Sequence, residues 1–223
     1  MKPIAHIEND LSTKFGVPRQ SGLIDKLMGR IIFEPEYRNP DALRGLEDFS
    51  HIWLLWDFSE AHTEGGWSPT VRPPRLGGNR RMGVFATRSP FRPNPIGLSS
   101  VRITQIEQST PRGPIIHVEG ADLMNGTPIL DIKPYLPFTD AHPEATGGFT
   151  DETRQQSPLE VTGLEHIVSI VNSEQLSVLR QILASDPRPH YQNDPARIYG
   201  LSFAGLDIHF RITENKVMVL DAR

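Results

Sequence analysis

Short runs of apolar and alternating residues, separated by turn residues, fill the first two-thirds of the chain. Several such runs at close spacing are typical of an all-β sandwich or barrel. One run, His51–Phe58, is nearly continuous in apolar residues and is therefore expected in the middle of a sheet. The full set of expected strands is Ile4–Ile7, Arg30–Phe33, His51–Phe58, Gly83–Thr87, Leu98–Ile106, Ile115–Val118 and Ile129–Tyr135.

Two other segments of this part depart from the strand pattern. A short helix is expected at Asp41–Leu46, where Asn39 can cap the helix and Pro40 can take its first position. A long loop rich in Gly and Pro then lies between Ser59 and Met82. Loops of this length without regular structure are usually functional or disordered. Trp67 and the arginines of this loop favour a functional role.

The pattern changes after residues 140–158, which contain few bulky apolar residues and are typical of a linker. Beyond them, Val161–Val171 is a strand candidate. Ser173–Ala184 is expected to be a helix capped by Ser173, because its leucines recur on one face. Gly200–Thr213 and Lys216–Leu220 resemble a hairpin.

These elements predict a mainly β protein with one β-barrel core and a small C-terminal α+β domain. The expected boundaries are 1–140 for the barrel, 141–157 for a linker and 158–223 for the C-terminal domain.

Composition narrows the classes of protein that remain. Of 223 residues, 37% are hydrophobic and none is cysteine, so a buried core is expected, and disulfides, zinc–thiolate sites and thiol catalysis are excluded. The longest apolar run, Ile52–Trp56, is far too short to cross a membrane. The first ten residues lack the apolar region of a secretory signal, so a cytoplasmic protein is expected.

Several common catalytic motifs are missing from the sequence. It contains no GxxxxGK[ST], GxGxxG or GxSxG motif, which argues against nucleotide-triphosphatases, Rossmann-type cofactor loops and hydrolases. The eight histidines do not fall at metal-ligand spacing, so no metal site is expected. His51 and His117 lie within expected strands and are interpreted as structural.

Charge is distributed unevenly along the chain. The stretch Gly65–Ile106 contains seven arginines, no lysine and no acidic residue. The rest of the chain has 16 basic and 27 acidic residues, or −11. Such a block indicates an anion-binding surface, because the planar guanidinium suits phosphate and carboxylate. A solvated arginine-rich loop paired with acidic neighbours is the alternative.

The run RSPFRPNP, residues 88–95, is a stiff turn within this block. Each of its three prolines fixes its own φ and keeps the preceding residue out of the helical region. Such a loop loses little entropy when it meets a ligand. Arg88, Arg92 and Asn94 could therefore hold a carboxylate or phosphate, unless the turn is only a rigid corner of the barrel.

In the run DIKPYLPFTD, residues 131–140, alternation places Asp131, Lys133 and Tyr135 on one face of a strand. An acid, an amine and a phenol side by side can perform acid–base chemistry or bind a polar ligand. A surface salt bridge beside a tyrosine is the alternative interpretation.

The run EGAD, residues 119–122, follows the strand Ile115–Val118. Bare backbone at Gly120 and the carboxylate of Asp122 would suit the base edge and ribose hydroxyls of an adenosine. The same residues are also ordinary in turns.

The run DPRPHY, residues 186–191, follows the expected helix. Its two prolines are expected to present Arg188 and Tyr191 outward, where Tyr191 could stack on a base. A packed tyrosine after a helix stop is an equal alternative.

Four of these stretches together resemble one family over nearly the whole chain. The chain is similar to the TsaA-like family in PRQSGL (18–23), GGWSPTVRPPRLGGNRRMGVFATRSPFRPNPIGLS (65–99), NGTPILDIKPYLPF (125–138) and DPRPHY (186–191). Its bacterial members are tRNA N6-methyltransferases that act on threonylcarbamoyladenosine, next to the anticodon. The resemblance implies a β-barrel, S-adenosylmethionine as methyl donor, and a homodimer whose donor pocket lies near the subunit contact.

The resemblance also implies which residues bind each partner. A donor segment is expected near Glu60–Ala61, and the other residues expected to bind S-adenosylmethionine are Ser21, Gly22, Leu23, Arg88, Leu98, Glu119, Gly120, Ala121 and Asp122. The residues expected to contact the anticodon region of tRNA are Arg72, Arg75, Arg80, Arg81, Arg92, Asn94, Arg188 and Tyr191.

For the chemical step, the main task is in-line placement of the weakly nucleophilic, urea-like N6 against the methyl group. Asp131 and Tyr135 are candidates to receive or relay the N6 proton, and Arg92 or Lys133 could hold the threonyl carboxylate. Two alternatives remain open at this point: an RNA-binding module without catalysis, and a methyltransferase of the same family with another substrate.

Overall fold

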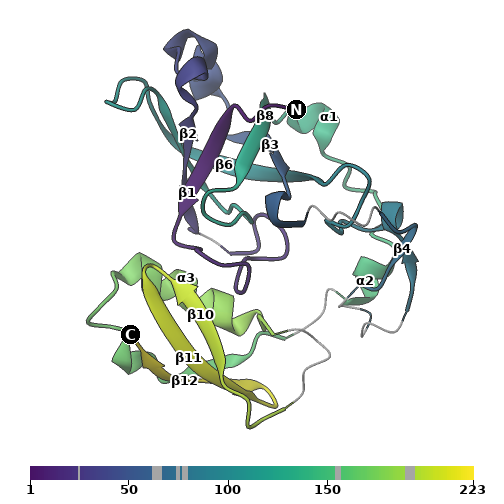
Figure 1. The fold of residues 1–223 in the computed structure, drawn as a ribbon, viewed down its shortest axis with the longest axis vertical. Coiled ribbons are helices and arrows are strands. Elements are labelled where there is room, and N and C mark those ends of the chain that lie inside the picture. The colour runs from purple at the N-terminus through teal and green to yellow at the C-terminus, as the bar shows by residue number, and fades with distance from the viewer. Residues whose placement is uncertain (25, 62–66, 74–75, 77–79, 154–156, 189–193) are drawn as a thin grey trace.

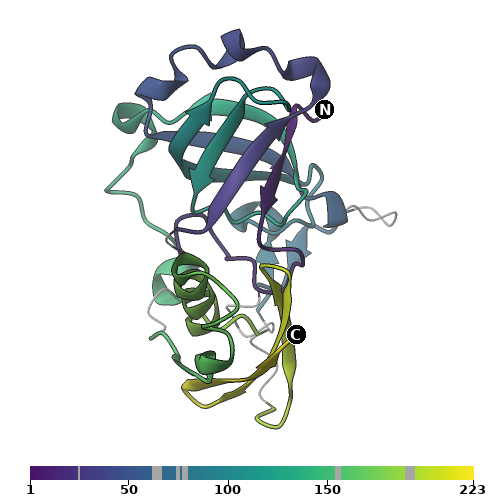
Figure 2. The ribbon, with the colours of Figure 1, turned by 90° about the vertical axis from the view of Figure 1, so that its left-hand side faces the viewer.

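The computed structural model describes residues 1–223 except 25, 62–66, 74–75, 77–79, 154–156 and 189–193. Figures 1 and 2 both show a β-barrel formed by the first part of the chain and, beside it, a smaller body of sheet and helix formed by the C-terminal part. The expected fold class, a mainly β protein with a barrel and a small α+β domain, is confirmed.

Six strands close the barrel in the order β1-β2-β7-β6-β3-β8, and every neighbouring pair is antiparallel. β3 lies between β6 and β8, as its apolar run predicted. The strands are β1 Ala5–Asn9, β2 Met28–Phe33, β3 His51–Asp57, β6 Ile96–Glu107, β7 Ile115–Glu119 and β8 Pro128–Pro134.

Alternation along β3 decides which side chains enter the barrel. Ile52, Leu54 and Trp56 are buried, whereas the residues between them are half-buried on the outer face. Together with residues of the other five strands, these side chains form the core inside the barrel, here called the barrel core. The part of the barrel wall formed by β3 therefore has one packed face inside the barrel and one outer face available for contacts.

Short 3-10 helices connect the barrel strands. The helix expected at Asp41–Leu46 is a 3-10 helix, η2 Pro40–Leu43, and the side chain of Asn39 caps it by accepting from the Asp41 amide at 3.0 Å. Among the described residues, the other 3-10 helices are η1 Pro35–Tyr37, η3 Leu46–Asp48, η4 Ser59–Ala61 and η6 Val84–Ala86 in the barrel part, and η7 Leu164–His166 in the C-terminal part.

The strand expected at Gly83–Thr87 is wrong. A two-stranded hairpin, β4 Thr70–Val71 and β5 Met82–Gly83, ends at Gly83, and η6 follows it. The Val84 amide donates to the Pro69 carbonyl at 3.0 Å, and the Thr87 hydroxyl donates to the Val84 carbonyl at 2.8 Å. These two bonds, the first of them to another segment, turn the chain, although its composition favours a strand.

The C-terminal body is a four-stranded sheet in the order β10-β11-β12-β9 with one long helix. Its elements are β9 Glu160–Thr162, α3 Ser173–Ala184, β10 Tyr199–Phe203, β11 Leu206–Thr213 and β12 Lys216–Ala222. The helix bounds match the expectation, but the cap is Asn172, whose side chain accepts from the Gln175 amide at 2.9 Å.

Two strand predictions in this body are wrong because of glycine turns. The expected strand Val161–Val171 stops after Thr162, because Gly163 has a φ of +80° and a Cβ there would lie 2.2 Å from the Val219 carbonyl oxygen. The expected strand Gly200–Thr213 is divided into β10 and β11 at Ala204 and Gly205, both with positive φ.

A segment of the barrel sequence belongs to the packing of the C-terminal body. Leu11, Ile24 and Leu27, which lie between β1 and β2, are buried in one cluster with residues of α3 and the C-terminal strands. Leu11 also forms a β-bridge with Phe203. This cluster is called the second core. The linker between the two bodies carries α1 Pro137–Asp140 and α2 Phe149–Thr153, and the domain boundaries stay a prediction.

No helix in the described part of the chain is both long and apolar enough to cross a bilayer.

Candidate functional site

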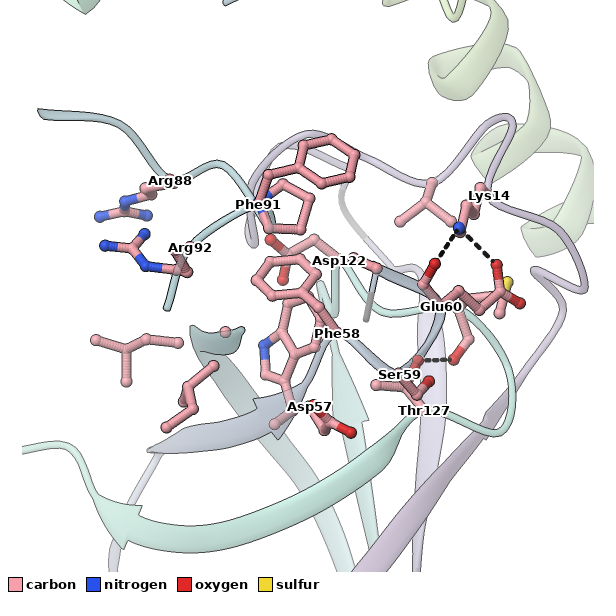
Figure 3. Close-up of a pocket in the computed structure, with 18 of the residues that line it drawn as sticks. Lys14, Asp57, Phe58, Ser59, Glu60, Arg88, Phe91, Arg92, Asp122 and Thr127 are labelled. Atoms are coloured by element: carbon pink, nitrogen blue, oxygen red, sulfur yellow. Dashed lines mark hydrogen bonds and ion pairs between the residues drawn. The ribbon is translucent and has the colours of Figure 1, made fainter. Parts of the chain in front are cut away.

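A cavity of about 680 Å³ opens at one end of the barrel. Four separate parts of the chain line it: residues 14–20 after β1, residues 56–61 at the end of β3 and in η4, residues 87–98 around the proline-rich turn, and residues 122–127 after β7. Figure 3 shows Arg88 and Arg92 on one side, Lys14 and Glu60 on the other, and Phe58, Phe91 and Asp122 between them.

Aromatic rings form the floor of this cavity. The rings of Trp56 and Phe58 lie 4.2 Å apart between centroids, and the Trp56 indole is only 8% exposed. Residue 97 must be glycine in this packing, because a Cβ there would lie 2.1 Å from the indole ring. The result is a rigid, largely apolar surface at the point where β3 and β6 pair.

A chain of hydrogen bonds leads from this floor to a buried carboxylate. The Trp56 Nε1 group donates to Ser99 Oγ at 2.9 Å, and Ser99 Oγ donates to Asp122 Oδ1 at 2.5 Å. Asp122 also accepts from the backbone amide of Ser21. Because Ser99 is almost completely buried, this chain fixes the orientation of the carboxylate.

Burial raises the pKa of the Asp122 carboxyl above its ordinary value, because desolvation disfavours the charged form. The hydrogen bond from Ser99 and the nearby Arg88 guanidinium counteract this effect in part. Asp122 is therefore a strong hydrogen-bond acceptor held in a cavity that favours a donor group on a ligand.

The turn that carries Arg88 and Arg92 is held by its own backbone. The Arg92 amide donates to the Pro90 carbonyl at 2.9 Å, and the Ile96 amide donates to the Asn94 carbonyl at 2.8 Å. The Arg92 side chain donates to the Thr87 carbonyl at 3.2 Å, and Arg88 donates to the Gln20 side chain. Arg88, Arg92 and Asn94 all line the cavity.

Lys14 and Glu60 close the opposite side. Lys14 Nζ donates to the Glu60 carbonyl at 3.2 Å and pairs with its carboxylate at 2.8 Å. This contact ties the loop after β1 to η4, so the cavity has walls on both sides (Figure 3).

The residues expected to bind the donor lie in or next to this cavity. Arg88, Leu98 and Asp122, which are far apart in sequence, line it together. Gly22 and Gly120 do not line it and are bonded to each other, because the Gly22 amide donates to the Gly120 carbonyl at 2.9 Å. The other expected positions do not line it: Ser21 beside Asp122, exposed Leu23, Glu119 facing Arg102, and buried Ala121.

The expected catalytic residues lie on the outer face of the barrel wall rather than in the cavity. Asp131 and Lys133 form an ion pair of 2.9 Å, and the Tyr135 ring lies 5.5 Å from that of Trp53. The register places Asp131 beside Leu55, and Leu55 beside Leu98, so this outer row ends at a residue that lines the cavity. Their catalytic role stays a prediction.

Of the residues expected to contact tRNA, Arg72, Arg80 and Arg81 are exposed. Arg75 and Tyr191 lie outside the described residues. These five positions stay predictions.

The expectation that Arg188 points outward is wrong. Its side chain is 14% exposed and pairs with the Asp186 carboxylate at 3.0 Å. Arg19, which lines the cavity, donates to the Asp186 carbonyl at 3.1 Å. The backbone at Asp186 therefore contacts the wall of the cavity. The two histidines expected to be structural are bonded locally, His117 to Glu107 and His51 to Ser50.

The sequence analysis missed the cavity residues Lys14, Gln20, Trp56 and Phe58. The inward position of Trp56 follows from the alternation of β3 and could have been found. Lys14 and Gln20 carry no such signal, because they reach the site only through pairing of distant segments.

The cavity residues fit the expected donor. The volume is within the usual range of small-molecule sites, and the aromatic rings and Asp122 suit a base, a sulfonium and hydroxyl or amino groups. Arg88 and Arg92 suit a carboxylate. Among the described residues, no group of three or more histidine or acidic side chains is arranged to hold a metal ion.

Comparison with known proteins gives the same family from both halves of the chain. Residues 6–141 match the model of the tRNA-methyltransferase O N-terminal domain, and residues 156–223 match that of the TrmO C-terminal domain. A tRNA (adenine(37)-N6)-methyltransferase of Escherichia coli is 40% identical over 95% of this chain and 92% of the relative. One of Eikenella corrodens is 47% identical over 77% of this chain and 95% of the relative.

A solved structure agrees with the sequence relatives. The crystal structure of TrmO from Pseudomonas aeruginosa superposes with a TM-score of 0.74 at 32% identity, and covers 99% of this chain and 97% of that one. The match includes both the barrel and the C-terminal body, and the family expected from the sequence motifs is confirmed. With a closed barrel, a walled cavity at its end and both domain models matched in order, the chain belongs to the tRNA-methyltransferase O family, whose named relatives are tRNA (adenine(37)-N6)-methyltransferases.

Proposed function

We propose that this protein transfers a methyl group from S-adenosylmethionine to N6 of threonylcarbamoyladenosine at position 37 of tRNA, in the cytoplasm and as a homodimer. The relatives named above support the reaction class and the position. The observation that carries the proposal is the cavity itself, in which Arg88, Leu98 and Asp122 meet although they come from three different segments.

Binding of the donor rests on the residues of the cavity. S-adenosylmethionine supplies a methyl group that is already activated by its sulfonium. Trp56 and Phe58 form an apolar, aromatic floor, and Asp122 accepts hydrogen bonds from hydroxyl or amino groups. Arg88 holds the donor's carboxylate. Because this set is preorganised by Ser99 and the proline-braced turn, placement can supply several kcal/mol, up to about 7–11 kcal/mol in ideal cases.

Proton transfer from N6 is assigned to the outer row of the barrel wall. Asp131 or Tyr135 receives or relays the proton, and Lys133 or Arg92 holds the threonyl carboxylate of the substrate. The Asp131–Lys133 ion pair supports this assignment, since it holds a carboxylate and an ammonium group side by side on the outer face of the wall. A second copy of the chain would have to cover this row for it to be shielded from water, and the 52% exposure of Leu98 is consistent with such a contact.

The experiment that tests the substrate is mass spectrometry of tRNA nucleosides from a strain that lacks the gene. Loss of methylated threonylcarbamoyladenosine, and its return when the wild-type gene is restored, is the expected result. If the methylated nucleoside persists unchanged, the substrate is different. Calorimetry with S-adenosylmethionine separates the enzyme from an RNA-binding module, because the module would give no binding heat.

A further inference from the structure

Exposed aromatic side chains are concentrated in the arginine-rich stretch that leads into the cavity wall. Among the described residues, four phenylalanine or tryptophan side chains are exposed: Trp67 (50%), Phe85 (72%), Phe91 (55%) and Phe138 (87%). Three of the four fall within 25 residues of sequence, and Trp67 and Phe85 contact each other, with ring centroids 5.9 Å apart and planes inclined by 33°. Paired exposed rings are unusual, because aromatic residues are normally the most thoroughly buried.

The short hairpin β4–β5 explains why the two rings stay together. Thr70 pairs with Gly83 at one end of the hairpin. The next two residues outward, Pro69 and Val84, are also joined, because the Val84 amide donates to the Pro69 carbonyl. Val84 is completely buried and anchors the segment. Trp67 and Phe85 therefore remain adjacent although they are exposed to water, because the hairpin hydrogen bonds and buried Val84 fix the backbone beside them.

The surroundings of the aromatic pair are positively charged. Val71 pairs with Met82 at the other end of the hairpin, so exposed Arg72 directly follows β4 and exposed Arg81 directly precedes β5. On the opposite side, Phe85 is three residues before Arg88, which lines the cavity. No acidic residue occurs from Gly65 to Ile106. A surface of paired rings between guanidinium groups is complementary to a single-stranded polyanion with flat bases.

We propose that Trp67 and Phe85 form a stacking platform for an unpaired base of the anticodon loop that flanks the methylated adenine. The inference rests on the proposed function, because only a tRNA substrate that presents its anticodon loop to the donor cavity brings an unpaired flanking base to these rings. Stacking of this kind tolerates any base, since every base has a π-face. Arg72 and Arg81 then contact the phosphates of the same strand.

The test compares binding of a synthetic anticodon stem-loop RNA to the full chain and to its variants. Fluorescence anisotropy gives the RNA affinity, and calorimetry gives the affinity for S-adenosylmethionine. Trp67→Ala and Phe85→Ala should each weaken RNA binding by at least about fivefold, and leave donor affinity unchanged. Phe138→Ala is the matched control, because it removes a still more exposed ring outside the arginine-rich stretch. It should bind RNA as the wild type does.

Two further readouts separate stacking from a general structural effect. In stem-loops with 2-aminopurine on either side of the target adenine, one probe should lose fluorescence on binding the wild type but not the Trp67→Ala variant. The slope of affinity against salt should be unchanged in this variant, whereas Arg72→Ala should make it shallower. Trp67→Phe should keep most of the affinity, because it retains a ring.

The outcomes also distinguish this inference from the proposed function. If the wild type binds donor and stem-loop, but the alanine variants bind RNA equally well, the stacking platform is wrong and the proposed function stands. If Trp67→Phe loses as much affinity as Trp67→Ala, stacking is not the cause and the platform is again wrong. If the wild type binds neither donor nor stem-loop, both proposals fail.

Discussion

The substitution Gly97→Ala tests how tightly the floor of the cavity is packed. A Cβ at residue 97 would lie 2.1 Å from Cε2 of Trp56 and 2.4 Å from Cζ2, far inside van der Waals contact. These atoms belong to a rigid, buried ring, so the indole must move as a whole. Overpacking of this kind costs about 1–3 kcal/mol. Loss of the indole hydrogen bond to Ser99 adds about 1 kcal/mol, which gives a total of about 2–4 kcal/mol.

Urea unfolding followed by tryptophan fluorescence is a direct assay for this loss. All three tryptophans (Trp53, Trp56 and Trp67) lie within residues 1–140, so the signal reports the barrel. Gly83→Ala is the matched control: its φ is −57°, and no heavy atom lies within 4 Å of the added Cβ. The control should change the free energy of unfolding by less than about 0.5 kcal/mol.

Donor binding supplies the second half of this test. Because the indole, Ser99 and Asp122 form one chain of hydrogen bonds, Gly97→Ala should also weaken S-adenosylmethionine binding in calorimetry. The reasoning is refuted if Gly97→Ala has the same unfolding free energy and donor affinity as Gly83→Ala. In that case the close approach of glycine and indole would have no energetic meaning.

Other predictions follow from single contacts. Asp122→Asn should weaken donor binding about tenfold, because a charged acceptor is lost. Burial raises the pKa of Asp122 in the folded state, so the wild type loses stability as pH rises from the pKa of the unfolded state to that of the folded state. Asn does not ionise, so the free energy of unfolding of Asp122→Asn minus that of the wild type should increase over this pH range and then level off. Urea titrations at stepped pH measure this difference. Arg88→Ala should weaken donor binding more than stem-loop binding, measured by calorimetry and anisotropy, whereas Arg72→Ala should do the reverse; equal effects of both on both ligands would contradict the division of the arginines. Asn172→Ala should lower the free energy of unfolding by about 1 kcal/mol through loss of the α3 cap, and an unchanged urea midpoint would contradict the capping contact.

The regular elements were predictable from local signals. Alternation located the barrel strands to within a few residues, because one face of each strand is buried. Asn39 and the leucine spacing of α3 likewise marked helices, since capping and burial of one face act within a few residues. The pattern left a sandwich and a barrel equally open, because closure depends on pairing of β1 with β8, more than 120 residues away. The family resemblance settled that choice.

The wrong predictions share a physical cause. Val161–Val171 and Gly83–Thr87 have the composition of strands, but contacts from distant segments end them. Gly163 is forced by the approach of the Val219 carbonyl, and η6 is fixed by the Pro69 carbonyl. A single sequence contains no sign of either neighbour.

The candidate site was only half visible in the sequence. The prolines and arginines of residues 88–95 indicated a ligand-binding turn, and this turn lines the cavity. Lys14 and Gln20 look like ordinary loop residues, because their importance arises only when the segment after β1 folds beside η4 and the turn. The prediction that Arg188 points outward was wrong, because its side chain turns back and pairs with Asp186.

The placement of Leu11, Ile24 and Leu27 in the second core determines how the gene can be divided. A shortened product that ends after residue 141 would retain these three side chains but lose the helix and strands that cover them. The apolar surface of these three side chains would then be exposed to water and promote aggregation during expression. The loop with Arg19 and Gln20 would also lose the hydrogen bond from Arg19 to the Asp186 carbonyl. The two family models therefore do not correspond to two separately packed cores, because residues matched by the first model are buried in the second core.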